Sequence, residues 1–456
     1  MNKNIKLAVA GAVLALSASA NAGIIIPAGD WTLDINGNVN AFANYTHAKA
    51  GTAGTAASTS SFVDEFGDFS AGIKDEVRHL HTEDPSNGYQ YNNAAPVTGG
   101  LAASPTGAKY GAKSVGINTG LLPSWLGFTG TTRQNDVDVS FTMSMQPNVS
   151  DNSAAGDAKT PLFRQAFLTF GDKSWGSFKL GKDIGIFASD AILNDMTLLG
   201  VGGGAGISGA STTLGGIGSG YIYAAWKGQV AYTTPNFNGF QATVGITNPN
   251  QQPNAVGNQD RFGLEGKVSY DIKQDGFSGK VWASGASYDV TNGATSYTVS
   301  VGDIGAHVDA GAFGVTGYYY GGKGAGTTIL GSNGTATTYN YQDVQNTDGT
   351  HSLVQTAVGS TNRRDSDGGY VQLTYATPIK TKIGVAYGIS NLDLASGEIA
   401  AENNTVKSNE RWTVGLYHPL TKHLNLVAEY NNIQSEAHDG TKAESDTYSA
   451  GAILFF

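Results

Sequence analysis

Apolar and polar residues alternate along residues 31–46. The apolar positions are Trp31, Leu33, Ile35, Val39, Ala41, Ala43 and Tyr45, and the polar positions between them include Thr32, Asp34, Asn36, Asn38, Asn40 and Asn44. Successive side chains of a β-strand point to opposite faces of the sheet. The pattern therefore predicts a strand with one apolar face and one polar face.

The same alternation recurs along the rest of the chain. Residues 137–146 place Val, Phe and Met on one face and Asp, Ser, Thr and Gln on the other, and residues 261–272 place Glu265 and Lys267 on the polar face. A soluble sandwich also alternates, but little sequence remains here to build its second layer. We therefore expect an all-β fold, a transmembrane antiparallel β-barrel of about sixteen strands with apolar residues outward and a polar lumen.

Short turns alternate with long loops, as in outer-membrane barrels. The long segments are residues 46–110, 183–220 and 321–367. The second is far longer than the 2 to 5 residues usual in a hairpin loop, so we expect it to fold inward and constrict the pore. The first contains His79 and His81 near carboxylates. A metal site is one interpretation of this pair, and ordinary solvated loop residues are the other.

The first 22 residues have the features of a signal peptide. Lys3 and Lys6 precede the apolar run 7–16, and Ala20-Asn21-Ala22 forms a small-residue cleavage site. No later run approaches the roughly 20 apolar residues of a transmembrane helix. The mature chain, 23–456, is therefore expected to cross the outer membrane with strands. It ends on Phe456 with alternate apolar residues before it, which resembles the signal that such barrels present to the insertion machinery.

Composition narrows the function classes further. The 456 residues include 63 glycines and no cysteine, and the formal net charge is −10. The acidic balance argues against a nucleic-acid partner. The eight histidines are scattered, and no arrangement of nucleophile, base and orienting residue is apparent. We expect neither an enzyme nor a cofactor or resident metal.

Several segments together resemble the general porins of Gram-negative outer membranes. They are Ser124–Gly130 (SWLGFTG), 164–167 (RQAF) followed by 176–182 (GSFKLGK), 229–240 (QVAYTTPNFNGF) and the terminal Phe456. The resemblance implies a homotrimer of 16-stranded barrels in outer-membrane lipid. Each barrel would pass ions and small hydrophilic solutes by passive diffusion and would have its third loop folded inward.

The resemblance also implies residues for the pore constriction. Asp190 and Asp195 match the acidic side of the inward loop, and Arg164 matches one basic position on the opposite wall. Trp125 stands where another arginine is expected, and Lys227 stands near a third. Lys179 is a further candidate, whereas Lys182 could instead face a neighbouring subunit. With few fixed positive charges, we expect a mild cation preference.

An alternative function is a substrate-specific channel. Trp125, Tyr223 and Trp226 could form an aromatic surface along which ring-bearing solutes slide. The competing interpretation places these side chains in the barrel wall or its aromatic girdles. The sequence leaves both open.

Overall fold

The computed structural model describes residues 23–49, 97–102, 113–147, 162–204, 212–248, 261–292, 295–345, 351–400 and 403–456, with the backbone alone for 291–295 and 337–361. The predicted signal peptide, His79, His81 and most of the first long loop lie outside these residues. Among the described residues, no helix is long and apolar enough to cross a membrane.

Strands make up almost all of the regular structure. The first ten are β1 Ile24–Ala28, β2 Trp31–Ala48, β3 Lys113–Asn118, β4 Trp125–Gln134, β5 Val137–Gln146, β6 Leu162–Asp172, β7 Gly176–Ile184, β8 Trp226–Thr233, β9 Phe240–Thr247 and β10 Gly263–Gln274. The others are β11 Phe277–Asn292, β12 Thr295–Ala310, β13 Phe313–Lys323, β14 Thr335–Gln345, β15 His351–Arg363, β16 Asp365–Ala376, β17 Lys382–Leu392, β18 Val406–Pro419, β19 Leu424–Ala437 and β20 Lys442–Phe455. Two short helices, α2 Ser189–Leu193 and η3 Met196–Leu199, lie between β7 and β8.

Eighteen strands form one sheet, which closes on itself because β2 pairs with β4 on one side and with β20 on the other. On one side of β2, β4 pairs with its first half and β3 with its second half. On the other side, β1 pairs with the start of β2 and β20 with the rest. The closed antiparallel barrel therefore has sixteen strands, as predicted. Closure leaves no unpaired edge along the ring.

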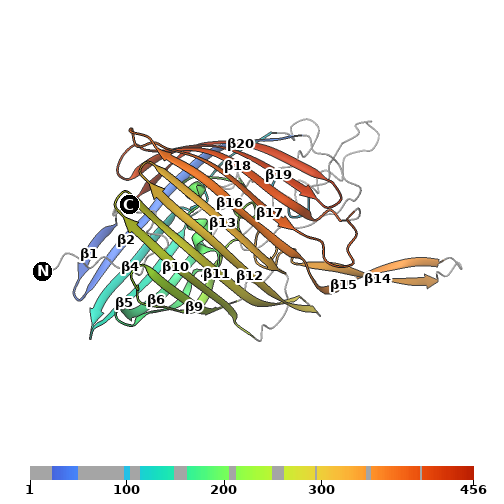
Figure 1. Ribbon diagram of the computed structural model, residues 1–456, viewed down its shortest axis with the longest axis horizontal. Coiled ribbons are helices and arrows are strands. Elements are labelled where there is room, and N and C mark those ends of the chain that lie inside the picture. Colours follow the sequence, from blue (N-terminus) through green and yellow to red (C-terminus); the bar gives the residue numbers. More distant parts are fainter. Residues whose placement is uncertain are drawn as a thin grey trace, which may run out of the picture.

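The two ends of the barrel differ. Tight turns such as Asn135-Asp136 and Asp275-Gly276 join strands at the end where the C-terminus lies (Figure 1), and the described parts of the long connections are at the other end. In outer-membrane barrels the short turns face the periplasm.

The predicted alternation of faces is confirmed on β5. Met143 on the outer face is 58% exposed, whereas Ser144 on the inner face is 4% exposed. The outward row on β10 is likewise apolar and exposed at Leu264, Val268 and Tyr270. A sheet with this arrangement presents apolar side chains to lipid and polar ones to its lumen.

Three strands were not predicted. β1 begins with Ile24-Ile25-Ile26, a run without polar alternation, and it forms a strand because it pairs with residues 31–35 of β2. β14 and β15 form a separate two-stranded hairpin within the stretch expected to be an irregular loop, 321–367. This hairpin extends away from the barrel at the long-loop end (Figure 1).

Candidate functional site

The segment between Ile184 and Trp226 enters the barrel, and Figure 1 shows its short helices (green) inside the ring of strands. Most of its described residues are buried, and Phe187, Ala191 and Tyr221 are completely so. The backbone turns inward at Ala188, which has a left-handed φ of 60°. We call the described residues 185–204 and 212–225 the inner loop.

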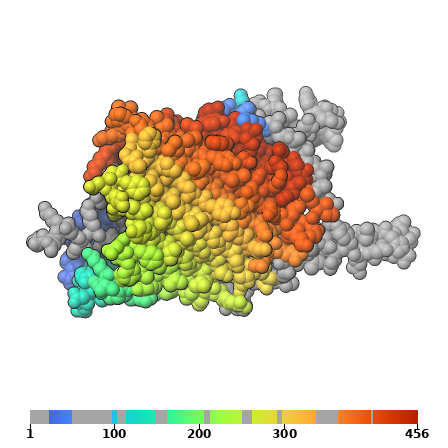
Figure 2. Space-filling model, viewed as in Figure 1, coloured from blue at the N-terminus to red at the C-terminus, as the bar shows by residue number. Residues whose placement is uncertain are grey.

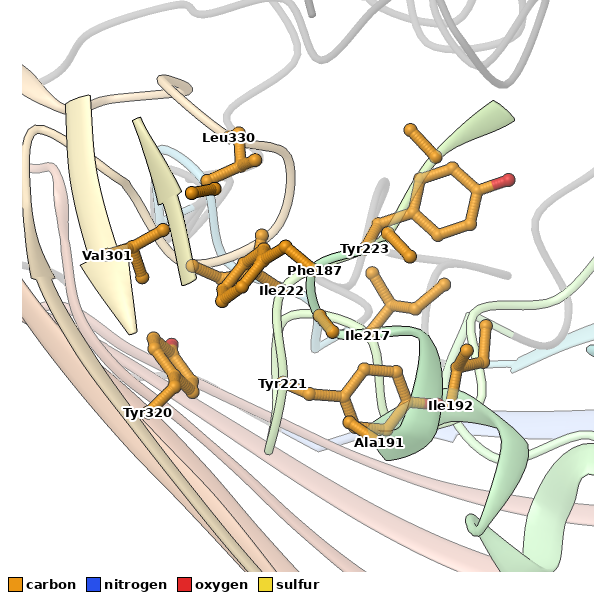
Figure 3. Close-up of a cluster of buried hydrophobic side chains, with 14 of the residues drawn as sticks. Phe187, Ala191, Ile192, Ile217, Tyr221, Ile222, Tyr223, Val301, Tyr320 and Leu330 are labelled. Carbon is orange, nitrogen blue, oxygen red and sulfur yellow. The ribbon is translucent and has the colours of Figure 1, made fainter. Parts of the chain in front are cut away.

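The inner loop has an apolar core of its own. Phe187, Ala191, Ile217 and Tyr221 pack together and against aliphatic and aromatic residues of the wall, among them Val301 and Tyr320 (Figure 3). Ala325, Ile329 and Leu330 from another long connection join the same cluster. The inner loop is therefore packed against the β11–β13 wall rather than suspended in the lumen.

A buried carboxylate anchors the start of the inner loop. Glu265 of β10 accepts hydrogen bonds from the backbone N–H groups of Ile186 (2.6 Å) and Phe187 (2.9 Å) through Oε2. Its Oε1 accepts from Lys227 Nζ (2.6 Å) and from the hydroxyl of Tyr288. Glu265 is 0% exposed, so Lys227 balances its charge away from bulk solvent. Glu265 thus holds the start of the inner loop, and Lys227 supports the loop through its ion pair with Glu265.

A second carboxylate anchors the far part of the loop from the opposite wall. Glu429 of β19 accepts from the N–H groups of Val201 (3.0 Å) and Gly202 (2.8 Å) and from the hydroxyl of Tyr417 (2.7 Å). The fit requires glycine at Gly200, where a Cβ would lie 1.9 Å from the Glu429 carboxylate. The two glutamates therefore fasten the inner loop across the barrel.

The two predicted loop aspartates also bind the wall. Asp190 pairs with Lys267 of β10 (2.7 Å) and with Lys280 of β11. Burial alone would raise the pKa of Asp190, but the two ammonium groups more than offset this and the pKa lies below its usual value. Asp190 therefore remains ionised, and the two lysines balance its charge.

Asp195 has three partners. Its Oδ1 accepts from the N–H of Thr197 and caps η3, and its Oδ2 accepts from the hydroxyl of Tyr221 (2.9 Å). Arg411 of β18 lies 3.5 Å from the same oxygen, and both charged side chains are 0% exposed. Asp195 thus joins the helical turn, the returning part of the loop and the wall.

The lumen-facing residues of β4–β7 differ from those packed against the loop. Thr129 and Thr142 are half-buried and share a hydrogen bond of 3.1 Å. Lys179 binds Asp183 at 2.5 Å and remains 29% exposed, and its ammonium lies 5.0 Å from the ring centre of Phe167. This side of the lumen is lined mainly by hydroxyl and amide groups, together with the partly exposed Lys179.

The remaining predicted site residues occupy different parts of the barrel. Arg164 is 7% exposed and lies at a register shift between β5 and β6. Among the described residues, no ion pair joins it to Asp190 or Asp195. The indole N–H of Trp125 points to Asn36 at 3.5 Å. The backbone of Phe456 exchanges two hydrogen bonds with Gly37 and so helps to close the ring.

Lys280, Arg411 and Glu429 were missed as members of this site. Strand periodicity places each on the lumen face, as it does for Glu265 and Lys267, but it cannot indicate which lumen residues meet the loop. Among the described residues, no cluster of three or more histidine, aspartate or glutamate side chains could hold a metal ion.

Comparison with known proteins gives one consistent result. A family model described as Gram-negative porin matches residues 7–438. A search of curated proteins finds no match.

Three solved structures share the fold. The outer membrane channel DcaP of Acinetobacter baumannii has 15% identity and a TM-score of 0.58, covering 94% of this chain and 99% of that one. An anion-selective porin from Comamonas acidovorans has 14% identity and a TM-score of 0.55, covering 93% and 100%. Salmonella typhi OmpF, in complex with daunomycin, has 14% identity and a TM-score of 0.54, covering 95% and 100%. At such low identity these likenesses show the fold alone.

Proposed function

The chain belongs to the Gram-negative porin family, and we propose that each barrel conducts ions and small hydrophilic solutes along one side of its lumen, as one subunit of a homotrimer. Its location in the outer membrane and its role as a channel for small solutes follow from the family and from the barrel. The barrel acts as a passive channel, without catalytic chemistry.

The inner loop and its anchors support a one-sided passage. Residues of the inner loop pack tightly against the wall along β10–β13 and β16–β19, where Glu265 and Arg411 are buried. Half-buried Thr129 and Thr142 and the partly exposed Lys179 lie on the other side. We therefore assign the passage to the side of β4–β7, with the inner loop, predicted as 183–220, as the constriction.

The charges suggest a mild cation preference. Asp190 and Asp195 are already matched by wall cations, so the transverse field at the constriction is weak. The chain as a whole is acidic. We propose that Lys179 and Arg164 restrain the cation preference, and that neutralising either raises cation over anion permeability.

A homotrimer suits the outer face of β5–β7. Exposed Met143, Leu168 and Phe170 share this face with Lys182, which is also exposed. A lysine on a lipid-facing wall is unfavourable at membrane depth. The face is therefore better suited to a protein neighbour than to lipid.

The aromatic, substrate-specific channel has less support. Tyr223 is buried in the apolar core of the inner loop and is not available to a passing solute, and Trp226 is partly buried against that core. Of the three aromatic candidates, Trp125 alone keeps a position beside the proposed passage.

Phe456 is proposed to act in assembly. Its backbone closes the ring at Gly37, and its aromatic end resembles the signal read by the barrel-insertion machinery. Deleting Phe456 should lower the amount of folded protein in the outer membrane more than it changes the conductance of the barrels that do assemble. Equal membrane levels of deletion variant and wild type would contradict this role.

Planar bilayers provide the central test. Purified protein should give stepwise conductance that rises in proportion to salt concentration, and a salt gradient should give a small reversal potential of the sign expected for cations. Saturable uptake of one solute class into liposomes would favour the specific channel. Protein that is folded and inserted but does not conduct would refute the diffusion function.

A further inference from the structure

The outer wall of β10–β13 contains a groove of about 720 Å³. Its floor is formed by three small neighbours on adjacent strands, Ala283, Ala306 and Gly317. Its sides are the larger outward residues Val268, Tyr270, Val281, Ile304 and Tyr319, all exposed. These strands face the viewer in Figures 1 and 2, in the yellow-green to orange part of the wall.

Nothing from the described chain fills this groove. A Cβ placed on Gly317 would meet no atom within 4 Å. Its lining is apolar, and it is continuous with the lipid-facing belt of Val244, Leu264 and Val371. An unfilled groove would deprive its lining of dispersion contacts on one side, so surrounding hydrocarbon is the natural occupant.

The position of the groove selects the membrane leaflet. Ala306 lies four residues before the end of β12 and Gly317 four residues after the start of β13, which is roughly 13 Å along the strand from the short-turn end. Phe240, the first residue of β9, borders the groove toward that end, as interfacial aromatic residues do. Since the short turns face the periplasm, the groove opens to the periplasmic leaflet.

We propose that this groove binds one acyl chain of a glycerophospholipid from the periplasmic leaflet as a long-lived, ordered lipid. The acyl chain lies along Ala283, Ala306 and Gly317, with the lipid head group at the level of Phe240. Behind the floor, Trp282, Tyr318 and Tyr370 face the lumen, and the Tyr370 hydroxyl donates to the carbonyl of Ala191 in the inner loop (2.8 Å). The bound chain therefore supports the wall against which the inner loop packs.

Native mass spectrometry in mild detergent tests the site, with phosphatidylethanolamine as the probe. Wild-type protein should retain one phospholipid per subunit. Gly317→Leu, which fills the groove, should reduce the lipid-bound fraction several-fold, and Ala306→Leu should do the same. The matched control is Gly266→Leu, an outward glycine of β10 whose added side chain also has room but which does not line the groove.

The outcomes separate the possible occupants. Lipid retention by wild type and Gly266→Leu, and its loss in both groove variants with unchanged conductance, supports the site. Equal retention by all four proteins, or none by wild type, overturns it. Selective retention of lipopolysaccharide in place of phospholipid overturns the leaflet assignment. Loss of oligomers in Gly317→Leu, with no lipid on wild type, would assign the groove to a second copy of the chain.

Discussion

At the scale of single residues, the lumen acids of this barrel hold its inner loop. Glu265 and Glu429 each accept hydrogen bonds from two consecutive backbone N–H groups, from opposite walls. They differ in their charge partners. Lys227 neutralises Glu265, whereas the partners recorded for Glu429 are backbone N–H groups, the Tyr417 hydroxyl and the Asn431 amide.

This difference predicts the relative cost of two matched substitutions. Glu265→Gln leaves Lys227 buried without its counter-ion and should destabilise the barrel by about 3 to 5 kcal/mol. Glu429→Gln places an amide group beside N–H donors but leaves no buried charge without a partner. We expect it to lower the free energy of unfolding by about 1 to 3 kcal/mol. Urea unfolding followed by tryptophan fluorescence measures both. Glu436→Gln, on the surface, serves as the control. A larger loss for Glu429→Gln would show that Lys227 does not depend on Glu265.

Lys179 gives a prediction about selectivity. At about 6 Å and an effective dielectric near 20, a unit charge changes the energy of a passing ion by about 3 kcal/mol, and screening over roughly 8 Å reduces this. Lys179→Gln should therefore shift the reversal potential toward cations. Lys182→Gln, three residues further on and on the outer face, should leave it unchanged. If the two variants behave alike, Lys179 does not border the passage.

At the scale of elements, strand periodicity predicted the wall but not the contacts of the loop. Glu265 and Lys267 were correctly placed on the inner face because a two-residue period is a local property of the chain. The bond from Gly202 to Glu429 spans 227 residues, and no local pattern encodes such a partner. β1 was missed for a related reason, since Ile24–Ile26 becomes a strand only by pairing with β2.

An outer connection supplies a pH-dependent prediction. Arg364, which directly follows β15, forms an ion pair with Glu398 in the loop after β17. Burial would raise the pKa of Glu398, but its bonds to Arg364 outweigh this and hold the pKa below its ordinary 4.5. Because the folded pKa is depressed, this contact stabilises the loop above about pH 4.5 and is lost as pH falls through the folded pKa.

Hydrogen exchange of residues 393–400 at a series of pH values tests this contact. After correction for the intrinsic exchange rate, protection should fall below about pH 4.5 in wild type. Glu398→Gln should show low protection at every pH. Wild-type protection that does not vary with pH would mean that the ion pair does not hold this loop.

At the scale of the whole molecule, the sixteen-strand barrel was predictable because its rule is local and repeated. The position of the passage could not be predicted from the sequence, because it depends on which wall the inner loop packs against. Lys227 was expected to shape the pore. It is instead bound to Glu265, the residue that anchors the start of the inner loop.

Oligomeric state gives one prediction at this scale. Closed hydrogen bonding leaves no strand edge for detergent to attack, so unboiled protein should migrate as a large SDS-resistant species that boiling converts to monomer. Lys182→Glu should weaken this species if the outer face of β7 contacts a neighbour, whereas Lys273→Glu, near the turn after β10, should not. A folded band at monomer mass before boiling would contradict the trimer and leave the barrel intact.

The side of the lumen that conducts can be identified because the chain contains no cysteine. Thr142 and Thr413 both face inward, but Thr142 is half-buried opposite Thr129, whereas Thr413 is fully buried and bound to Arg411 and Asn431. A charged methanethiosulfonate reagent should modify Thr142→Cys within the open channel and lower its conductance. Thr413→Cys should remain unmodified until the protein is unfolded. Rapid block of Thr413→Cys, with Thr142→Cys unaffected, would place the passage between the inner loop and β18, and the two glutamate anchors would then be contacts that open during conduction.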